Sequence, residues 1–257
     1  MDIKEYIAGG SSIENHPWEI ARFNVICSII QKYISEKTEV IADVGCGDIF
    51  FLENLSKKLK NKKLLAIDTA FTDELIVQLR EKYHHQTEIS FFQNISDVVN
   101  TEKGSDLIFL MDVIEHIEND KEFLNNLITS DLVKNGCVLV ITVPAFQYLF
   151  SSHDTWLGHY RRYNLKSLRN VLDFDNIEVA EMGYFFKSLV CFRFLQKILE
   201  KKNSNDKGTD VSNWQGGKIK TFLYKTILWF DYVIFNKLLR LKKLPGLSCF
   251  LIAKIQK

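Results

Sequence analysis

The sequence predicts an α/β fold, in which the strands of a mostly parallel sheet alternate with helices on both faces. Two observations predict it. Short apolar runs typical of buried strands recur at residues 40–42, 63–67 and 89–92. Apolar residues at helical spacing follow, first at Leu52 and Leu55. Such alternation implies right-handed crossovers between parallel strands.

Polar residues or a proline stand at the end of each expected strand. They are Asp43, Asp68, Asn94, Asp112 and Pro144. The carboxyl ends of parallel strands meet at one edge of the sheet, and ligands bind beyond that edge. The sequence therefore predicts a binding site there.

The loop after the first strand reads Gly45-Cys46-Gly47, and a helical pattern begins directly after it. Glycines allow a sharp turn, and the following helix points its free N–H groups at a ligand. Asp68 stands 21 positions after Gly47, where a carboxylate can accept hydrogen bonds from ribose hydroxyls. A dinucleotide-binding loop needs a third glycine, which is absent here because Asp48, Ile49 and Phe50 follow Gly47, and Asp43 favours a cationic group. A cationic adenosine derivative fits better than a dinucleotide.

Residues 14–35 predict an amphipathic helix with Pro17 in its first turn. Arg22 lies on it, one turn after Trp18. Arg22 either approaches a cofactor carboxylate from a helical lid or docks the helix on the sheet.

Charge is divided unevenly along the chain. Residues 1–186 carry 18 basic and 28 acidic groups, a net charge of −10. Residues 187–257 carry 15 basic and 4 acidic groups, a net charge of +11. A basic end suggests an anionic partner. Five scattered cysteines without a Cys-x-x-Cys pair and an N-terminus without an apolar signal segment favour the cytoplasm.

Four segments resemble those of class I S-adenosylmethionine-dependent methyltransferases. They are residues 40–48 (Val-Ile-Ala-Asp-Val-Gly-Cys-Gly-Asp), 66–68 (Ala-Ile-Asp), 106–117 and 136–144. The resemblance implies S-adenosylmethionine as the cofactor and a Rossmann-like, seven-stranded, mostly parallel sheet with an antiparallel last strand. The sequence departs from the family pattern at Ile49, where the family often has glycine, and at Gln93-Asn94, where an acidic residue is common. The implied cofactor-binding residues are Asp43, Gly45, Cys46, Gly47, Asp68, Thr69, Asn94, Ile95, Met111, Asp112 and Arg22.

The same resemblance divides the chain into four parts. Residues 1–35 form an N-terminal helical lid and residues 36–186 the methyltransferase core. Residues 187–243 form a basic helical C-terminal insertion that contains a polar linker at 200–217. Residues 244–257 supply the last strand of the core.

Residues 144–163, called the acceptor loop below, are rich in reactive side chains. They resemble a bacterial methyltransferase subgroup with a His-Asp…Gly-His-x-Arg-Arg-Tyr signature, associated with glycan, lipid or cell-envelope pathways. An alcohol acceptor must lose a proton, which favours a His or carboxylate base. The catalytic candidates are His153, Asp154, His159 and His116, and the substrate-binding candidates are Phe146, Tyr148, Arg161, Arg162 and Tyr163. Alternatively, these side chains only tie the loop together. No metal is predicted, because the spacing matches no zinc pattern.

Residues 218–243 predict an amphipathic helix. Lys225, Asp231 and Lys237 interrupt its apolar pattern, which argues against a transmembrane span. The helix either covers the sheet or a substrate pocket, or lies on an anionic membrane face. Its apolar stripe consists of Leu223, Ile227, Phe230, Ile234, Leu238 and Leu241.

The sequence thus predicts a methyltransferase that methylates oxygen on a small hydroxylated acceptor, such as a saccharide or a lipid-linked glycan intermediate. Methylation of RNA or protein is an alternative, but the acidic core disfavours nucleic acid. A non-catalytic cofactor-binding scaffold is a further alternative, and a dinucleotide oxidoreductase is a weaker one. The oligomeric state cannot be predicted.

Overall fold

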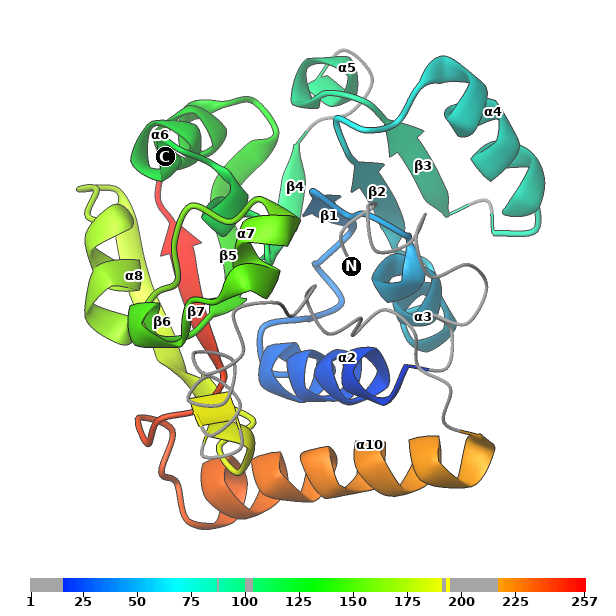
Figure 1. Cartoon of the computed structure of the whole chain (residues 1–257). Coiled ribbons are helices and arrows are strands. Elements are labelled where there is room, and N and C mark those ends of the chain that lie inside the picture. The colour runs from blue at the N-terminus through cyan, green and yellow to red at the C-terminus, as the bar shows by residue number, and fades with distance from the viewer. Residues whose placement is uncertain (1–15, 87, 100–103, 191–192, 195–216) are drawn as a thin grey trace.

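The protein is built on one seven-stranded sheet with the order β3-β2-β1-β4-β5-β7-β6. The computed structural model describes residues 16–86, 88–99, 104–190, 193–194 and 217–257 (Figure 1). The strands are β1 (Val40–Val44), β2 (Lys63–Ile67), β3 (Ile89–Phe92), β4 (Ser105–Met111), β5 (Val133–Pro144), β6 (Ile177–Phe185) and β7 (Ser248–Ile255).

The strands β1 to β5 pair in parallel, whereas β7 runs antiparallel between β5 and β6. The predicted seven-stranded sheet with an antiparallel last strand is therefore confirmed. Among the seven predicted strands, β6 was not located from the sequence. It lies at the sheet edge, and its half-exposed residues give a weak apolar signal.

Helices cover both faces of the sheet, and each face has its own apolar core. One core joins the sheet to α2 (Pro17–Ile30), α3 (Phe50–Lys58) and α4 (Asp73–Lys82). The other joins it to α5 (Ile95–Val99), α6 (Asp120–Thr129) and α8 (Leu165–Val171). The remaining elements are the 3-10 turns η2 (Ile114–His116) and η3 (Gln147–Leu149), the short helix α7 (Ser152–Leu157), α10 (Lys218–Tyr232) and the π-helix η4 (Val233–Leu238).

The basic C-terminal helix α10 packs mainly on α2 (Figure 1). The helix α2 therefore lies between the sheet and α10. The first fifteen residues of the expected lid, and the polar linker at 200–217 except Gly217, lie outside the described residues. Among the described helices, none has the length and apolar character needed to cross a bilayer.

Candidate functional site

The glycine loop after β1 has the backbone that its sequence requires. Gly45 and Gly47 have φ angles of 75° and 59°, which an L side chain rarely adopts. A Cβ on Gly45 would also lie 2.6 Å from a methyl carbon of Val113. Gly47 donates its N–H to the Asp68 carboxylate over 2.8 Å. The loop is thereby tied to the end of β2, where Asp68 was predicted to bind a ribose.

Asp43, near the end of β1, is fully buried. Within the part of the chain that the structure describes, neither of its carboxylate oxygens has a hydrogen-bond partner. Burial raises the pKa of Asp43 to about 7, and the nearby carboxylates of Asp68 and Asp48 add to this rise. A buried, unpaired carboxylate is costly unless a ligand supplies its partner. The site therefore suits a cationic ligand.

Backbone strain gathers at the same edge of the sheet. Ile49, Asp112 and Phe146 have φ angles of 65°, 56° and 65°, in the left-handed region. They follow β1, β4 and β5, respectively. Such strain concentrates at binding sites, where surrounding contacts impose it.

Arg22 connects α2 to this edge. Its guanidinium is buried and donates to Glu19 over 2.8 Å and to Asp112. Burial lowers the pKa of Arg22, but the two carboxylates outweigh that effect and raise it. Arg22 thus docks the helix on the sheet end. It lies at the predicted cofactor edge, but its charge is already balanced by protein carboxylates.

The other predicted cofactor residues follow the strands as expected. Cys46 is buried, and burial raises the pKa of its thiol, which stays protonated. Thr69 and Asn94 are exposed after β2 and β3. Asn94 donates its backbone N–H to the Asp97 carboxylate over 3.1 Å, and its backbone carbonyl accepts the N–H of Asp97 over 3.2 Å. Ile95 begins α5, and Met111 and Asp112 lie at the end of β4.

Asp154 organises the acceptor loop. Its carboxylate accepts hydrogen bonds from Arg162 over 2.6 and 2.9 Å, from the Ser151 N–H over 2.9 Å and from the Ser151 hydroxyl. Nδ1 of His159 lies 2.9 Å from it. Burial raises the pKa of Asp154, but the bonds from His159 and Arg162 outweigh burial and hold it below its usual range. Asp154 is therefore an ionised residue that positions its neighbours.

His159 and His116 meet beside Asp154. Their rings lie 4.5 Å apart between centroids, edge to face. Glu115 adds a fully buried carboxyl whose two oxygens have no hydrogen-bond partner among the described residues. Burial and the Asp112 charge raise the pKa of Glu115. Ligand atoms of Glu115, His116 and His159 all lie within 4.8 Å of one another, so this group could hold a metal ion.

Glu115 was missed at the sequence level. The available signal was an acid and a histidine at consecutive positions in the turn after β4, inside an otherwise apolar run. Acids in apolar surroundings at a strand end are candidates for a functional role.

The remaining candidates occupy different environments. His153 stacks on Trp156, 5.9 Å away, and burial lowers its pKa. Arg161 pairs with Asp120 over 2.8 Å. Tyr163 is buried, and its hydroxyl donates to Asp120 over 2.6 Å. The structure therefore brings Arg161, Arg162 and Tyr163 into protein contacts that support the loop.

Phe146 and Tyr148 form an aromatic surface. Phe146 stacks on Tyr148 at 5.2 Å and on Tyr184 at 5.1 Å between ring centroids. Tyr148 is 53% exposed. Of the substrate-binding candidates, these two retain apolar surface for an acceptor.

Known proteins similar to this chain include methyltransferases. Residues 18–180 match the family model described as methyltransferase domain. The mitochondrial ubiquinone biosynthesis O-methyltransferase of Dictyostelium discoideum is 25% identical over 178 residues, which cover 59% of this chain and 54% of that protein. The ubiquinone biosynthesis O-methyltransferase of Rickettsia bellii is 25% identical over 173 residues, which cover 63% of this chain and 71% of that protein. The match thus spans about half of the first relative.

A solved structure shares the fold. The plantazolicin methyltransferase BamL, in complex with a triazolic desmethylPZN analog and SAH, has a TM-score of 0.52 at 12% identity, covering 99% of this chain and 89% of that one. The family match extends from α2 into β6 and includes the glycine loop and the acceptor loop. The chain therefore belongs to the class I S-adenosylmethionine-dependent methyltransferases, and S-adenosylmethionine is its methyl donor.

Proposed function

We propose that this methyltransferase methylates a hydroxyl oxygen of a small acceptor and that His159 is the general base. The observation that carries the proposal is the contact of His159 with the buried, ionised Asp154. A protonated Nδ1 that faces the carboxylate leaves Nε2 as a proton acceptor. The relatives in Dictyostelium and Rickettsia are named O-methyltransferases, which also supports oxygen as the acceptor atom.

The described residues fit the methyl donor. Asp43 supplies a buried carboxylate without a partner among the described residues, which suits the cationic part of S-adenosylmethionine. Asp68, at the end of β2, would hold the ribose hydroxyls. When bound, the cofactor supplies a methyl group on a positively charged sulfur, and that sulfur leaves as a neutral thioether.

The chain's own residues then perform the proton transfer. As the acceptor oxygen forms its bond to the methyl carbon, its proton passes to Nε2 of His159. Asp154 keeps the imidazole in the correct tautomer and stabilises the imidazolium that forms. Arg162 holds Asp154 in place through two hydrogen bonds. A positioned base of this kind contributes roughly 100- to 10,000-fold to the rate.

The acceptor we favour is a saccharide or a lipid-linked glycan intermediate, which stacks on Phe146 and Tyr148. The names of the relatives support a second candidate, a hydroxylated precursor in ubiquinone biosynthesis. Methylation of RNA or protein, and a scaffold without turnover, remain the competing proposals. We further propose a cytoplasmic enzyme whose segment 218–243 meets an anionic membrane surface.

Methyl transfer from labelled S-adenosylmethionine to fractionated lipid and sugar extracts tests the function. We expect label in the fraction with hydroxylated acceptors, and His159→Gln should reduce the turnover rate at least 100-fold with cofactor affinity within about threefold. His153→Gln, on the neighbouring helix α7, separates the two histidines. A larger loss from His153→Gln than from His159→Gln would assign the base to His153. Label in RNA or protein alone would reject the proposed acceptor class.

A further inference from the structure

Polar contacts fix how α10 is rotated on the body of the protein. Asp231 is buried and accepts the N–H groups of Lys187 and Ser188 over 2.8 and 2.7 Å. Asn236 is buried one turn later and donates to the carbonyl of Tyr184 over 2.8 Å. Buried polar groups of this kind are costly to break, so the helix cannot turn without losing them. The side of the helix that faces outward is thus specified.

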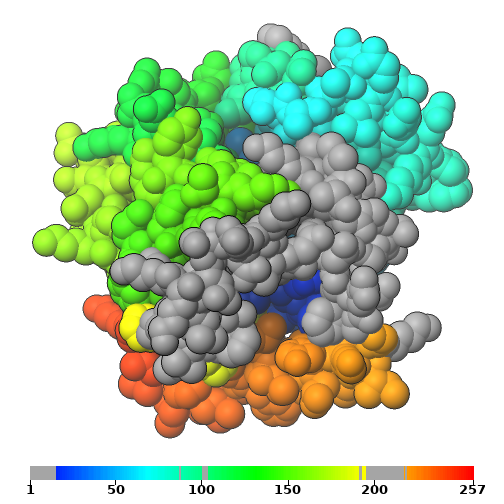
Figure 2. Space-filling model, in the orientation of Figure 1, coloured from blue at the N-terminus to red at the C-terminus, as the bar shows by residue number. Residues whose placement is uncertain are grey.

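The outward side is the apolar one. We call Leu223, Ile227, Phe230, Ile234, Leu238 and Leu241 the outer face; the first five lie on α10 and η4, Leu241 follows the end of η4, and each is between 41% and 71% exposed. An amphipathic helix on a globular protein normally turns its apolar stripe inward. Here the stripe that the sequence predicts is the exposed surface, and Figure 2 shows α10 along the lower rim of the molecule. Large exposed apolar patches mark interaction sites.

The segment that carries the outer face is strongly basic. Residues 218–243 contain seven Lys or Arg and one acid, Asp231, which is buried and bonded. A two-fold symmetric contact would place two such segments against each other, which charge repulsion opposes. An anionic partner with an apolar interior suits both properties.

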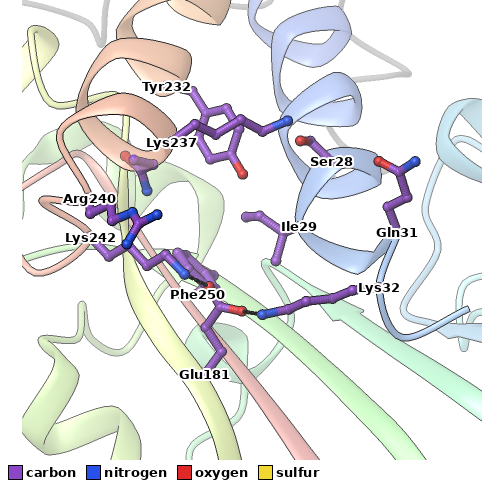
Figure 3. Close-up of a pocket in the computed structure, with 11 residues that line it drawn as sticks. Ser28, Ile29, Gln31, Lys32, Glu181, Tyr232, Lys237, Arg240, Lys242 and Phe250 are labelled. Carbon is purple, nitrogen blue, oxygen red and sulfur yellow. Dashed lines mark hydrogen bonds and ion pairs between the residues drawn. The ribbon is translucent and has the colours of Figure 1, made fainter.

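A basic pocket opens between α2 and η4. Its volume is about 640 Å³, and Lys32, Lys237, Arg240 and Lys242 line it (Figure 3). Glu181, the carboxylate among its lining residues, pairs with Lys32 and Lys242. Within the described residues, neither Lys237 nor Arg240 forms an ion pair with a carboxylate. The pocket therefore has excess positive charge, which suits a phosphate.

A second, more apolar pocket adjoins the first. It has a volume of about 680 Å³, and it shares Ser28, Gln31 and Lys237 with the basic pocket. Its apolar lining is Cys27, Ile30, Ile34, Leu55, Leu59 and Trp229. A cationic pocket beside an apolar one matches the two parts of a phospholipid, an anionic head and a hydrocarbon chain.

We propose that the outer face of α10 and η4 docks on an anionic phospholipid membrane and that the basic pocket receives a lipid headgroup phosphate. The apolar side chains enter the acyl boundary while Lys237 and Arg240 contact headgroups. The inference deepens the membrane contact in the proposed function, but it does not depend on which acceptor is methylated or on which histidine is the base.

Flotation of the full chain with vesicles tests this docking. Vesicles of phosphatidylcholine alone are compared with vesicles that also contain phosphatidylglycerol, at about 0.15 M salt. We expect binding to the anionic vesicles that weakens as salt rises. Each basic residue near an anionic surface contributes about fivefold in affinity, so K237E/R240E should lose at least tenfold. Phe230→Ser with Ile234→Ser should also weaken binding, including at low salt.

A matched control is K166E/R169E, which makes the same change in charge at exposed positions of α8. It should bind anionic vesicles within about threefold of the unaltered protein. All variants should keep the melting temperature and the cofactor affinity of the parent, because none of these residues lies at the cofactor edge. Vesicle binding without methyl transfer would support the docking while the proposed function fails.

Three results would overturn the proposal. The first is equal binding of K237E/R240E and the parent to anionic vesicles. The second is full competition by inorganic phosphate at matched ionic strength, which would assign the pocket to free phosphate. The third is a lipid-free dimer that Phe230→Ser with Ile234→Ser dissociates in sedimentation experiments, which would assign the outer face to a second copy.

Discussion

Two aspartates, both fully buried, distinguish the two halves of the site. Asp43 in the cofactor half has no hydrogen-bond partner among the described residues, and burial raises its pKa to about 7. Asp154 in the acceptor loop receives bonds from His159, Arg162 and Ser151, and its pKa lies below its usual range despite burial. The Asp43 carboxylate requires a ligand to complete its contacts, whereas the Asp154 carboxylate already holds its neighbours in place. Two aspartates that are equally buried can therefore have different roles.

The largest expected effect is that of Asp154→Asn on stability. The neutral amide leaves the Arg162 guanidinium buried without a counter-charge, and breaking a buried ion pair costs about 3–5 kcal/mol. Urea unfolding at pH 7.5 should show a decrease of this size in the free energy of unfolding. Cofactor affinity, measured by calorimetry, should stay within about threefold. A decrease below about 1 kcal/mol would mean that Asp154 does not hold the loop.

Asp43→Asn should have the opposite profile. Removing a buried carboxylate without a partner should leave the free energy of unfolding at pH 8 unchanged or raise it by about 1–2 kcal/mol. A hydrogen bond to a charged group is worth about 1.5–3 kcal/mol, so S-adenosylmethionine should bind roughly 10- to 100-fold more weakly. Calorimetry and urea unfolding on the same preparation measure both quantities. Loss of stability in this variant would contradict the comparison of the two aspartates.

The pH dependence of cofactor binding sharpens the comparison further. A cationic ligand selects the ionised form of Asp43, so affinity should rise about tenfold per pH unit up to about pH 7 and then level off. In the free protein, the raised pKa of Asp43 gives the free energy of unfolding the opposite dependence on pH. The folded state holds this proton between about pH 4 and 7 while the unfolded state releases it, so the contribution to stability falls as pH rises through that window.

Calorimetry at pH 6 in two buffers with different ionisation enthalpies measures this coupling. We expect release of close to one proton for each cofactor bound, and Asp43→Asn should abolish it. Asp154→Asn serves as the control, because the pKa of Asp154 lies too low for it to titrate near pH 6. Proton release that survives Asp43→Asn would place the titrating group elsewhere.

The sequence was most informative where local pattern decides structure. The strands β2 and β3 begin and end where predicted, because a buried apolar run stops at a polar residue. The apolar stripe of α10 was also predicted, from the helical spacing of its apolar residues. Which way the stripe faces depends on Asp231 and Asn236, whose partners lie more than 40 positions earlier. No local pattern carries that information.

The same limit applies to the acceptor loop. Sequence spacing identified Asp154, His159 and Arg162 as a group, since all lie within nine residues. It did not predict that Arg162 pairs with Asp154 and that Arg161 pairs with Asp120, because those pairings depend on the turn of the loop. Glu115 joins His159 from another strand end, so only the folded sheet brings them together.

The smallest expected effect concerns Ile49, where the resemblance to methyltransferases would place glycine. Its φ of 65° lies in the left-handed region, which costs a β-branched residue about 1–2 kcal/mol. Its side chain is nonetheless buried, at 1% exposure, and packs in the core beneath the glycine loop. The packing offsets the strain, so the loop keeps the conformation that glycine would adopt.

Two substitutions separate the strain from the packing. Ile49→Ala loses the buried side chain but keeps the strain, whereas Ile49→Gly loses both. Alanine is normally more stabilising than glycine by about 0.5–1 kcal/mol in regular structure. Here we expect the reverse order, with Ile49→Gly more stable than Ile49→Ala by about 1 kcal/mol in urea unfolding. If Ile49→Ala is more stable than Ile49→Gly, the backbone at position 49 is not strained. The glycine loop would then not hold its left-handed conformation at Ile49.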